Sequence, residues 1–179
     1  KWYSFNEAVE LNKKSPRKII MDVYTDWCGW CKYMDKTTFA NPQIAKYINT
    51  NYYPVKFNAE GADTVVYKGI QYTNERLGKI DEYGNTIKKA NHSFTSKVLK
   101  VGSYPTLVFF DDSLNLITPL PGYQSEFDIQ PVIIYFYENL YKYINLQDFI
   151  NDFKTAYIDS LKPKSHGIEW LNINDAVKK

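Results

Sequence analysis

The chain has two cysteines, Cys28 and Cys31, and their spacing is the first sign of chemistry in the sequence. An apolar, β-prone run over residues 18–24 precedes them, and a helical pattern follows through about Lys36. The pair is therefore predicted to lie where a helix begins. The free N–H groups and the dipole of that end favour an anion, so we expect the pKa of the Cys28 thiol to fall. Helical spacing brings Cys31 close enough to attack a mixed disulfide, so the sequence supplies a nucleophile and a resolving thiol.

A zinc site is the main structural alternative for the two cysteines. Zinc takes four ligands, and the only histidines, His92 and His166, lack the spacing of a metal-binding finger. Both histidines are therefore predicted to be surface residues, and a Cys–His hydrolase is disfavoured as well. A structural disulfide framework would show several cysteines spread along the chain. We expect no metal and no dissociable cofactor.

The composition is that of an ordinary globular protein of 179 residues, with 44% hydrophobic and 23% charged residues. A net charge of +2 gives no electrostatic reason to expect nucleic acid or a membrane surface as a partner. No apolar run approaches the roughly 18 residues of a transmembrane segment. The 16 Tyr and 10 Phe are interpreted as core and surface aromatics rather than as a platform for stacking bases.

The elements that must position the cysteines follow from hydrophobic periodicity and capping signals. Ser4 and Glu7 form a capping box, and Asn41 followed by Pro42 marks another helix start. Helices are predicted over residues 4–11, 28–36, 42–49, 93–102, 128–143 and 146–161, strands over 18–24, 52–57, 106–110 and 116–119, and a hairpin over 64–67 and 70–73.

Four segments, in the following order along the chain, resemble parts of the thioredoxin superfamily. The segment 22–32 is similar to the active-site segment of that family, and 55–58 is similar to its next strand. The segment 103–106 resembles the loop that carries the family's cis-proline, and 121–123 falls where the family has a glycine after its closing hairpin. The similarity covers roughly residues 15–145. It implies an α/β thioredoxin fold with a central mixed β-sheet flanked by helices.

The resemblance also implies roles for three residues behind the cysteines. Asp22 would be buried behind the pair, Lys56 would be its partner, and Pro105 would follow a cis peptide bond and pack against the cysteines. A carboxylate in an apolar strand is costly unless it is paired or neutral, so we interpret Asp22 as the group that moves a proton to and from Cys31. The alternatives are an exposed acid at the strand end for Asp22 and a solvated lysine for Lys56.

The predicted substrate-binding residues surround the two cysteines. They are Trp27, Gly29, Trp30, Tyr104 and Thr106. The two tryptophans are expected to face the substrate, with a core-capping role as the alternative for Trp27. Pro105 is expected to shape the groove and to keep side chains from blocking the sulfurs.

Two features depart from the family pattern and concern the domain organisation and the partner. The dipeptide between the cysteines is Gly29-Trp30, and the stretch between Glu60 and Lys97 is longer than the minimal fold needs. We therefore predict a thioredoxin-like domain over residues 1–162 with an insertion at about 61–97 and extra C-terminal helices. Residues 163–179 are predicted to be a linker and the possible start of a second repeat, because the stretch from Trp170 echoes the stretch from Trp2.

The predicted function is thiol–disulfide exchange with protein or peptide substrates, in the reducing direction and with an upstream thiol donor. Strong oxidants of this family have a histidine between their cysteines, whereas Gly29-Trp30 carries no charge. The alternative is a non-catalytic binding or chaperone-like module with a static disulfide. A peroxide-reducing enzyme would place its cysteine in another motif. Paired redox cysteines suit the periplasm or cell envelope, with the cytoplasm as the alternative location.

Overall fold

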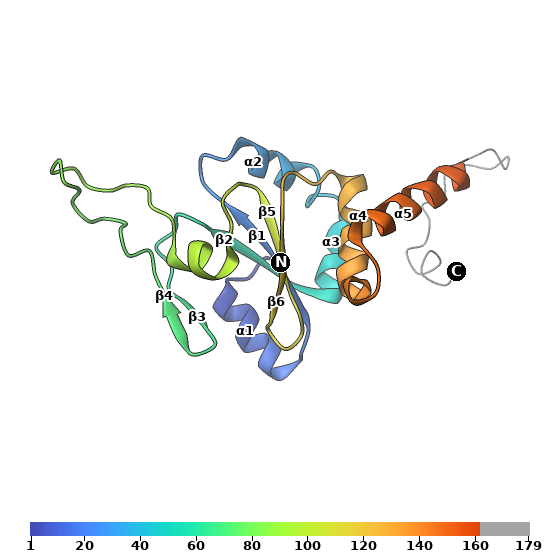
Figure 1. Cartoon of the computed structure of the whole chain (residues 1–179), viewed down its shortest axis with the longest axis horizontal. Helices are drawn as coiled ribbons and strands as arrows, with labels where there is room; N and C mark the ends of the chain where they lie inside the picture. Colours follow the sequence, from blue (N-terminus) through green and yellow to red (C-terminus); the bar gives the residue numbers. More distant parts are fainter. Residues whose placement is uncertain (162–179) are drawn as a thin grey trace. The chain divides into compact units, whose positions relative to one another are not determined.

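The computed structural model describes residues 1–161, which divide into two compact units, 1–126 and 127–161 (Figure 1). The elements are α1 (Phe5–Lys14), β1 (Lys18–Tyr24), α2 (Gly29–Lys36), α3 (Pro42–Asn51), β2 (Tyr52–Asn58), β3 (Val65–Tyr67), β4 (Ile70–Tyr72), the π-helix η1 (Thr95–Leu99), β5 (Thr106–Phe110), β6 (Leu116–Pro121), α4 (Glu126–Tyr137), the 3₁₀-helix η2 (Leu140–Lys142) and α5 (Leu146–Leu161). Among these described helices, none has the length and apolar character needed to span a membrane.

The first unit is built on a four-stranded sheet with the order β2-β1-β5-β6. Strands β1 and β2 are parallel, whereas β1–β5 and β5–β6 are antiparallel. Before α1, Tyr3 forms a parallel bridge to Val55 of β2. This mixed sheet with helices around it confirms the predicted fold class, and the strand boundaries agree with the hydrophobic runs of the sequence.

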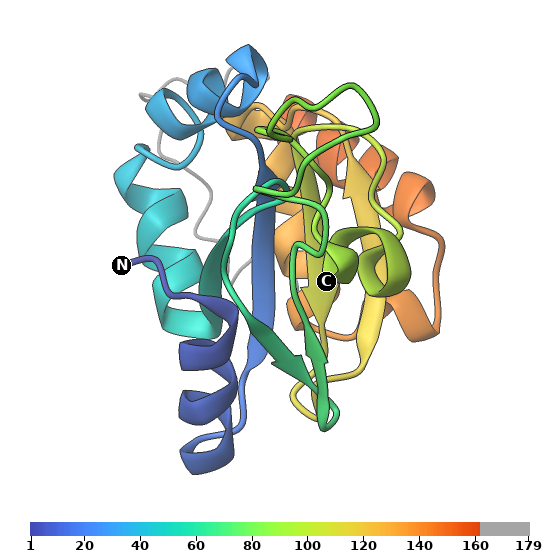
Figure 2. The same ribbon diagram turned by 90° about the vertical axis from the view of Figure 1, so that its left-hand side faces the viewer.

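One face of this sheet carries the main hydrophobic core of the unit. Alternate side chains of β1 point to opposite faces, so Ile19, Met21 and Val23 face one side. They pack with Phe5 of α1, with Phe94 beside η1 and with the hairpin β3-β4, which lies in front of the strands in Figure 2. The same alternation places Asp22 on the other face of the strand. Ile20 shares that face and is fully buried, so Asp22 is a carboxylate in buried, largely apolar surroundings.

The starts of α1 and α3 agree with their capping signals, whereas the end of α1 differs from its prediction. Ser4 and Glu7 form the predicted capping box of α1. We predicted that this helix ends near Leu11, but it continues to Lys14 and stops at Ser15, before Pro16. The lysines of its last turn face the negative end of the helix dipole, which favours the extra turn.

The stretch between β2 and β5 departs most from expectation. The hairpin β3-β4 is present, and the following residues form a long loop that projects from the rest of this unit (Figure 1). A helix was predicted over 93–102. The structure has the shorter π-helix η1 there, which ends where Lys100 adopts a left-handed φ of 56°.

In the C-terminal part, two separate helices stand where one long helix was predicted. The helix predicted over 128–143 ends at Tyr137, because Asn139 adopts a left-handed φ of 60° before η2. The predicted helix over 146–161 is present as α5. The linker and second repeat predicted for residues 163–179 lie outside the described residues, so they stay predictions.

Candidate active site

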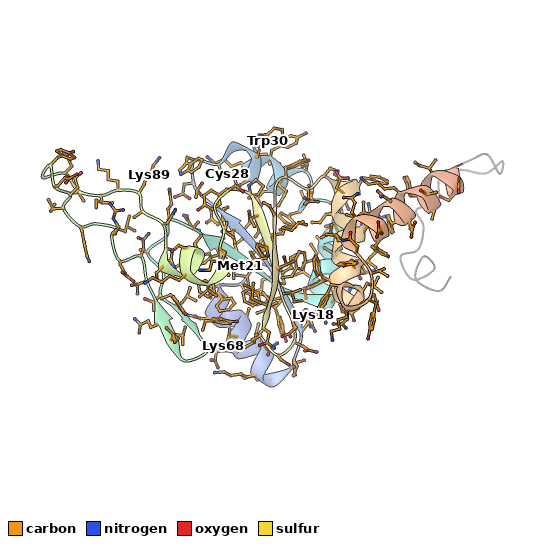
Figure 3. All side chains as sticks on the ribbon, in the orientation of Figure 1. Lys18, Met21, Cys28, Trp30, Lys68 and Lys89 are labelled. Atoms are coloured by element: carbon orange, nitrogen blue, oxygen red, sulfur yellow. A yellow bond between two sulfur atoms is a disulfide. The ribbon has the colours of Figure 1, made fainter. Side chains whose placement is uncertain are left out.

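Cys28 and Cys31 lie at the N-terminus of α2 and are joined by a disulfide. Cys28 is the N-cap residue, and its Sγ accepts the backbone N–H of Cys31 at 3.0 Å. Their Cα atoms are 5.3 Å apart, and both side chains are buried. Figure 3 labels Cys28 at this helix start. Both residues therefore occupy the position that the spacing predicts.

The electrostatics of this helix start favour a negative sulfur. The first turn of α2 contains no acidic residue, so nothing on the helix itself opposes its positive end. The N–H of Cys31 already points at Sγ of Cys28. When the disulfide is reduced, the same donor and the helix dipole can stabilise the thiolate of Cys28.

Asp22 and Lys56 form an ion pair on the face of the sheet opposite the main core. The two residues are register partners in the parallel pair β1–β2. Nζ of Lys56 lies 2.6 Å from Oδ2 of Asp22, whose side chain is fully buried. Oδ1 of Asp22 has no hydrogen-bond partner within residues 1–161. One carboxylate oxygen is therefore neutralised, and the other is available to take up a proton.

Lys56 is shared with a second carboxylate. Its Nζ lies 2.5 Å from Oδ1 of Asp35, which projects from the last part of α2. The same ammonium lies over the rings of Trp2, Tyr24 and Phe39, at 5.2, 5.0 and 5.7 Å from their centroids. Burial alone would lower the pKa of Lys56, but the two carboxylates raise it above its ordinary value. Lys56 therefore stays a cation that connects β1 and β2 to α2.

Asp22 has the most perturbed titration of the described acids. Burial raises its pKa from 3.8 to about 6, although Lys56 acts in the opposite direction, and the nearby charge of Asp35 adds to the rise. An acid whose pKa lies near 6 changes charge close to neutral pH, which is the range that a proton carrier needs.

Changing Asp35 to Asn should lower the pKa of Asp22, because a repelling charge disappears and Lys56 keeps only one anionic partner. The pH dependence of the Asp22 carboxyl chemical shift would measure this. Asp26→Asn is the matched control, since it removes the same charge from an exposed carboxylate that bonds to Asn58 rather than to Lys56. Equal titration of Asp22 in both variants and in the parent would contradict the coupling.

The loop before β5 contains the proline that the sequence singled out. The peptide bond between Tyr104 and Pro105 is cis, and the carbonyl of Pro105 accepts the N–H of Gly122 at 2.9 Å. We expected Thr106 to contact substrate. Its side chain is instead buried, and its hydroxyl donates to the carbonyl of Ser103 at 2.7 Å. Thr106 therefore holds the loop, and its contact with substrate stays a prediction.

Trp27 and Trp30 flank the disulfide as exposed rings, with 55% and 62% of their surface accessible. Trp27 does not cap the core: its Nε1 donates to Oε2 of Glu60 at 3.0 Å, and its ring meets that of Tyr104 edge-on at 6.0 Å. Trp30 projects from α2 away from the strands (Figure 3). Gly29 between the cysteines is exposed, with open space around it.

His92 differs from its prediction as a surface residue. It is fully buried against the ring of Phe57, at 5.2 Å between centroids. Its Nε2 bonds to the carbonyl of Asp63 and its Nδ1 accepts the N–H of Phe94, so both ring nitrogens are used inside the protein. Burial lowers its pKa. Within residues 1–161, no three His, Cys, Asp or Glu side chains are grouped as a metal site.

Sequence reasoning did not find all the residues near the cysteines. Asp35 stands four residues after Cys31, so helical spacing alone could have placed both on the inner side of α2. Trp2, Phe39 and Glu60 gave no local signal, because each reaches the site from a separate part of the chain. Of the predicted set, Asp22 and Lys56 are brought together, and so are Trp27 and Tyr104.

Comparisons with known proteins agree with this geometry. A family model described as a thioredoxin-like domain matches residues 5–137. The "Thiol:disulfide interchange protein DsbD" of Escherichia coli K12 is 29% identical over 106 residues, which is 59% of this chain but 14% of that protein. The DsbD of Pectobacterium atrosepticum is 28% identical over 98 residues, 55% of this chain and 12% of that protein. The chain thus spans a small fraction of the length of these relatives.

Two solved structures are similar in fold. A thioredoxin from Thermus thermophilus superposes with a TM-score of 0.51 at 13% identity, and the match covers 75% of this chain and 84% of the thioredoxin. A thioredoxin-fold protein from Helicobacter pylori superposes with a TM-score of 0.52 at 19% identity and covers 81% of this chain and 84% of its own.

Proposed function

Because the chain belongs to the thioredoxin-like domain family, we propose that it is a thiol–disulfide oxidoreductase acting on protein or peptide disulfides through Cys28 and Cys31. The observation that carries this proposal is the disulfide at the start of α2, where Sγ of Cys28 accepts a helix N–H. A sulfur in this position is stabilised as a thiolate, which is both the attacking and the leaving group of disulfide exchange.

The reaction proceeds in two exchanges. The thiolate of Cys28 attacks one sulfur of a substrate disulfide, forms a mixed disulfide and releases the other substrate sulfur as a thiolate. Cys31 then loses its proton and attacks Sγ of Cys28, which forms the Cys28–Cys31 disulfide and releases the second substrate thiolate. Two electrons pass from the protein to the substrate. Asp22 is proposed to accept the proton of Cys31 on Oδ1, the oxygen that Lys56 leaves without a partner.

The surrounding residues are proposed to position the substrate. Trp27, Trp30 and Tyr104 offer ring surface beside the disulfide, and Gly29 leaves the approach open. Pro105, which has no N–H, shapes the groove without adding a donor that would compete for the sulfurs.

Turnover of a protein disulfide tests the activity itself. The chain should accelerate the reduction of insulin by dithiothreitol, measured by the precipitation of the free B chain. A Cys28→Ser/Cys31→Ser double variant is the control for non-specific effects. Equal rates with both proteins would favour the alternative, a binding or chaperone-like module with a static disulfide.

The proposed direction is reduction of the substrate. The residues between the cysteines, Gly29 and Trp30, carry no charge that would further stabilise the reduced form. We therefore expect a redox potential near the thioredoxin value of about −270 mV, far from the ~−120 mV of the strong periplasmic oxidant. Equilibration with glutathione buffers of known ratio, followed by alkylation and mass spectrometry, measures it. A potential above roughly −180 mV would make the protein an oxidase or isomerase instead.

The proposal includes an upstream thiol donor and a location in the bacterial cell envelope. A reductant must be reduced again after each turnover, and the matched relatives are named thiol:disulfide interchange proteins. Fractionation of cells producing the natural protein would test the location, with the cytoplasm as the alternative.

A further inference from the structure

Two exposed aromatic rings of α2 and one half-buried ring packed against both form a contiguous patch two residues along the helix from Cys28. Trp30 and Tyr33 come from the helix, and Tyr123 comes from the segment after β6. Their ring centroids lie 5.4 Å (Trp30–Tyr123), 5.5 Å (Tyr33–Tyr123) and 5.9 Å (Trp30–Tyr33) apart. Trp30 is 62% exposed and Tyr33 is 50% exposed. We call these three residues the α2 aromatic patch.

The α2 aromatic patch is held in place before any partner arrives. Gly122 has a φ of 101°, which a residue with a side chain rarely adopts, and its N–H bonds to the carbonyl of Pro105. The hydroxyl of Tyr123 lies 3.3 Å from that of Thr37, and Thr38 donates to the carbonyl of Gln124 at 2.6 Å. A rigid aromatic surface loses little conformational entropy when it is covered, so it is well suited to docking.

Two exposed lysines lie on the same helix as Trp30 and Tyr33. Lys32 and Lys36 lie one helical turn apart on α2, both are exposed, and neither forms an ion pair with a residue of the described chain. The acid on the same helix, Asp35, is already bound to Lys56. The exposed side of α2 is therefore positively charged as well as aromatic.

The opposite side of the disulfide has a different character. Trp27 there is bonded to Glu60, and Asp26 next to it is exposed, while Lys89 lies over the ring of Trp27 at 6.0 Å. Charges of both signs thus balance around Trp27. The Trp27 side thus carries Asp26 and Glu60 beside its lysine, whereas the acid of α2, Asp35, is bound to Lys56.

From this asymmetry we infer that the α2 aromatic patch, with Lys32 and Lys36, docks disulfide-bearing polypeptides whose cysteines are flanked by acidic residues. The inference rests on the proposed function and adds the substrate class. Opposite charge speeds encounter and fixes orientation, and the rings bury apolar surface once the partner is in place. The patch adjoins Cys28, so a polypeptide docked on it brings its disulfide to the attacking sulfur.

Three matched peptides test the inference. Each carries the same intramolecular disulfide, and the flanking positions are Glu, Gln or Lys. The reduced protein is mixed with each peptide, and formation of the Cys28–Cys31 disulfide is followed by acid quench, alkylation and mass spectrometry. At about 0.01 M salt the Glu peptide should react about tenfold faster than the Lys peptide. At about 1 M salt the rates should converge, because screening removes the charge preference.

Two charge-reversal variants locate the effect. In Lys32→Glu/Lys36→Glu the preference should reverse toward the Lys peptide. In Lys14→Glu/Lys46→Glu, which makes the same change of net charge on exposed residues of α1 and α3, the Glu peptide should remain the faster one. Comparing the ratio of rates within one variant cancels any change in the reactivity of Cys28 itself.

The contribution of the rings is tested by Tyr33→Ser. This exposed substitution should slow all three peptides several-fold without changing their order. Equal rates for the three peptides, or a faster reaction of the Lys peptide with the parent, would overturn the inference. Reduction of the Gln peptide would still support the proposed function in that case. If no peptide is reduced, both the proposed function and this inference fail.

Discussion

Replacing Cys31 with Ser should stop multiple turnover and leave the protein trapped as a mixed disulfide with its substrate through Cys28. Sγ of Cys28 is the atom that accepts the helix N–H, so we propose Cys28 as the attacking sulfur and Cys31 as the resolving one. Without Cys31, release of the substrate from Cys28 depends on an external thiol. A thiol held next to the mixed disulfide has an effective concentration of about 10⁵ M or more in well-oriented reactions, and this advantage is lost. The trapped species should be visible by mass spectrometry under non-reducing conditions.

The reciprocal variant gives the control. Cys28→Ser should trap no mixed disulfide, because Cys31 lies inside the first turn of α2 rather than at its N-cap, where Sγ of Cys28 accepts a helix N–H. Alkylation of the reduced parent should modify Cys28 first. Mixed disulfides formed by Cys31, or its preferential alkylation, would reverse the assignment of the two roles.

Local patterns in the sequence were sufficient to predict the strands of the sheet and the position of the two cysteines. The apolar run over residues 18–24 and the helical pattern after it place Cys28 at the helix start, and both features depend only on neighbouring residues. The ion pair of Asp22 with Lys56 followed from the family resemblance. The register of β1 and β2 now gives its physical reason, because the two residues stand opposite each other in parallel strands.

The parts that the sequence could not predict depend on contacts between distant segments. The bond from Asp35 to Lys56 requires the tilt of α2 over the sheet, which no local pattern encodes. The burial of His92 arises from a carbonyl at Asp63 and a ring at Phe57, both far from it along the chain.

Replacing Asp22 with Asn should change how stability depends on pH. The pKa of Asp22 is about 6 in the folded protein, above the ~3.9 of an unfolded chain. Between these values the folded state holds the proton that the unfolded state has lost, so parent stability falls as pH rises from about 4 to about 6 and is level above that. The loss is on the order of 3 kcal/mol, at 1.36 kcal/mol per pKa unit.

The Asn variant has no carboxyl at this position, so that fall should disappear from its stability curve. Urea unfolding of the oxidised proteins at pH 4 and pH 8 measures the difference, with Asp26→Asn as an exposed control that should follow the parent. Lys56 keeps Asp35 as a partner in this variant, so the fold should remain intact. A difference in stability between parent and Asp22→Asn that is the same at pH 4 and pH 8 would contradict the raised pKa.

The same substitution should slow the second exchange by about a hundredfold, the ordinary contribution of a positioned acid–base group. At pH 7 and above Asp22 is largely ionised, so Oδ1 can take the proton of Cys31 as that sulfur attacks Cys28. An amide cannot accept this proton, and Cys31 must then lose it to water. Single-turnover experiments with a peptide disulfide separate formation of the mixed disulfide, which Asp22→Asn should leave near the parent rate, from its resolution. If resolution keeps the parent rate across pH 6–9, Asp22 contributes to structure alone and the proton of Cys31 leaves by another route.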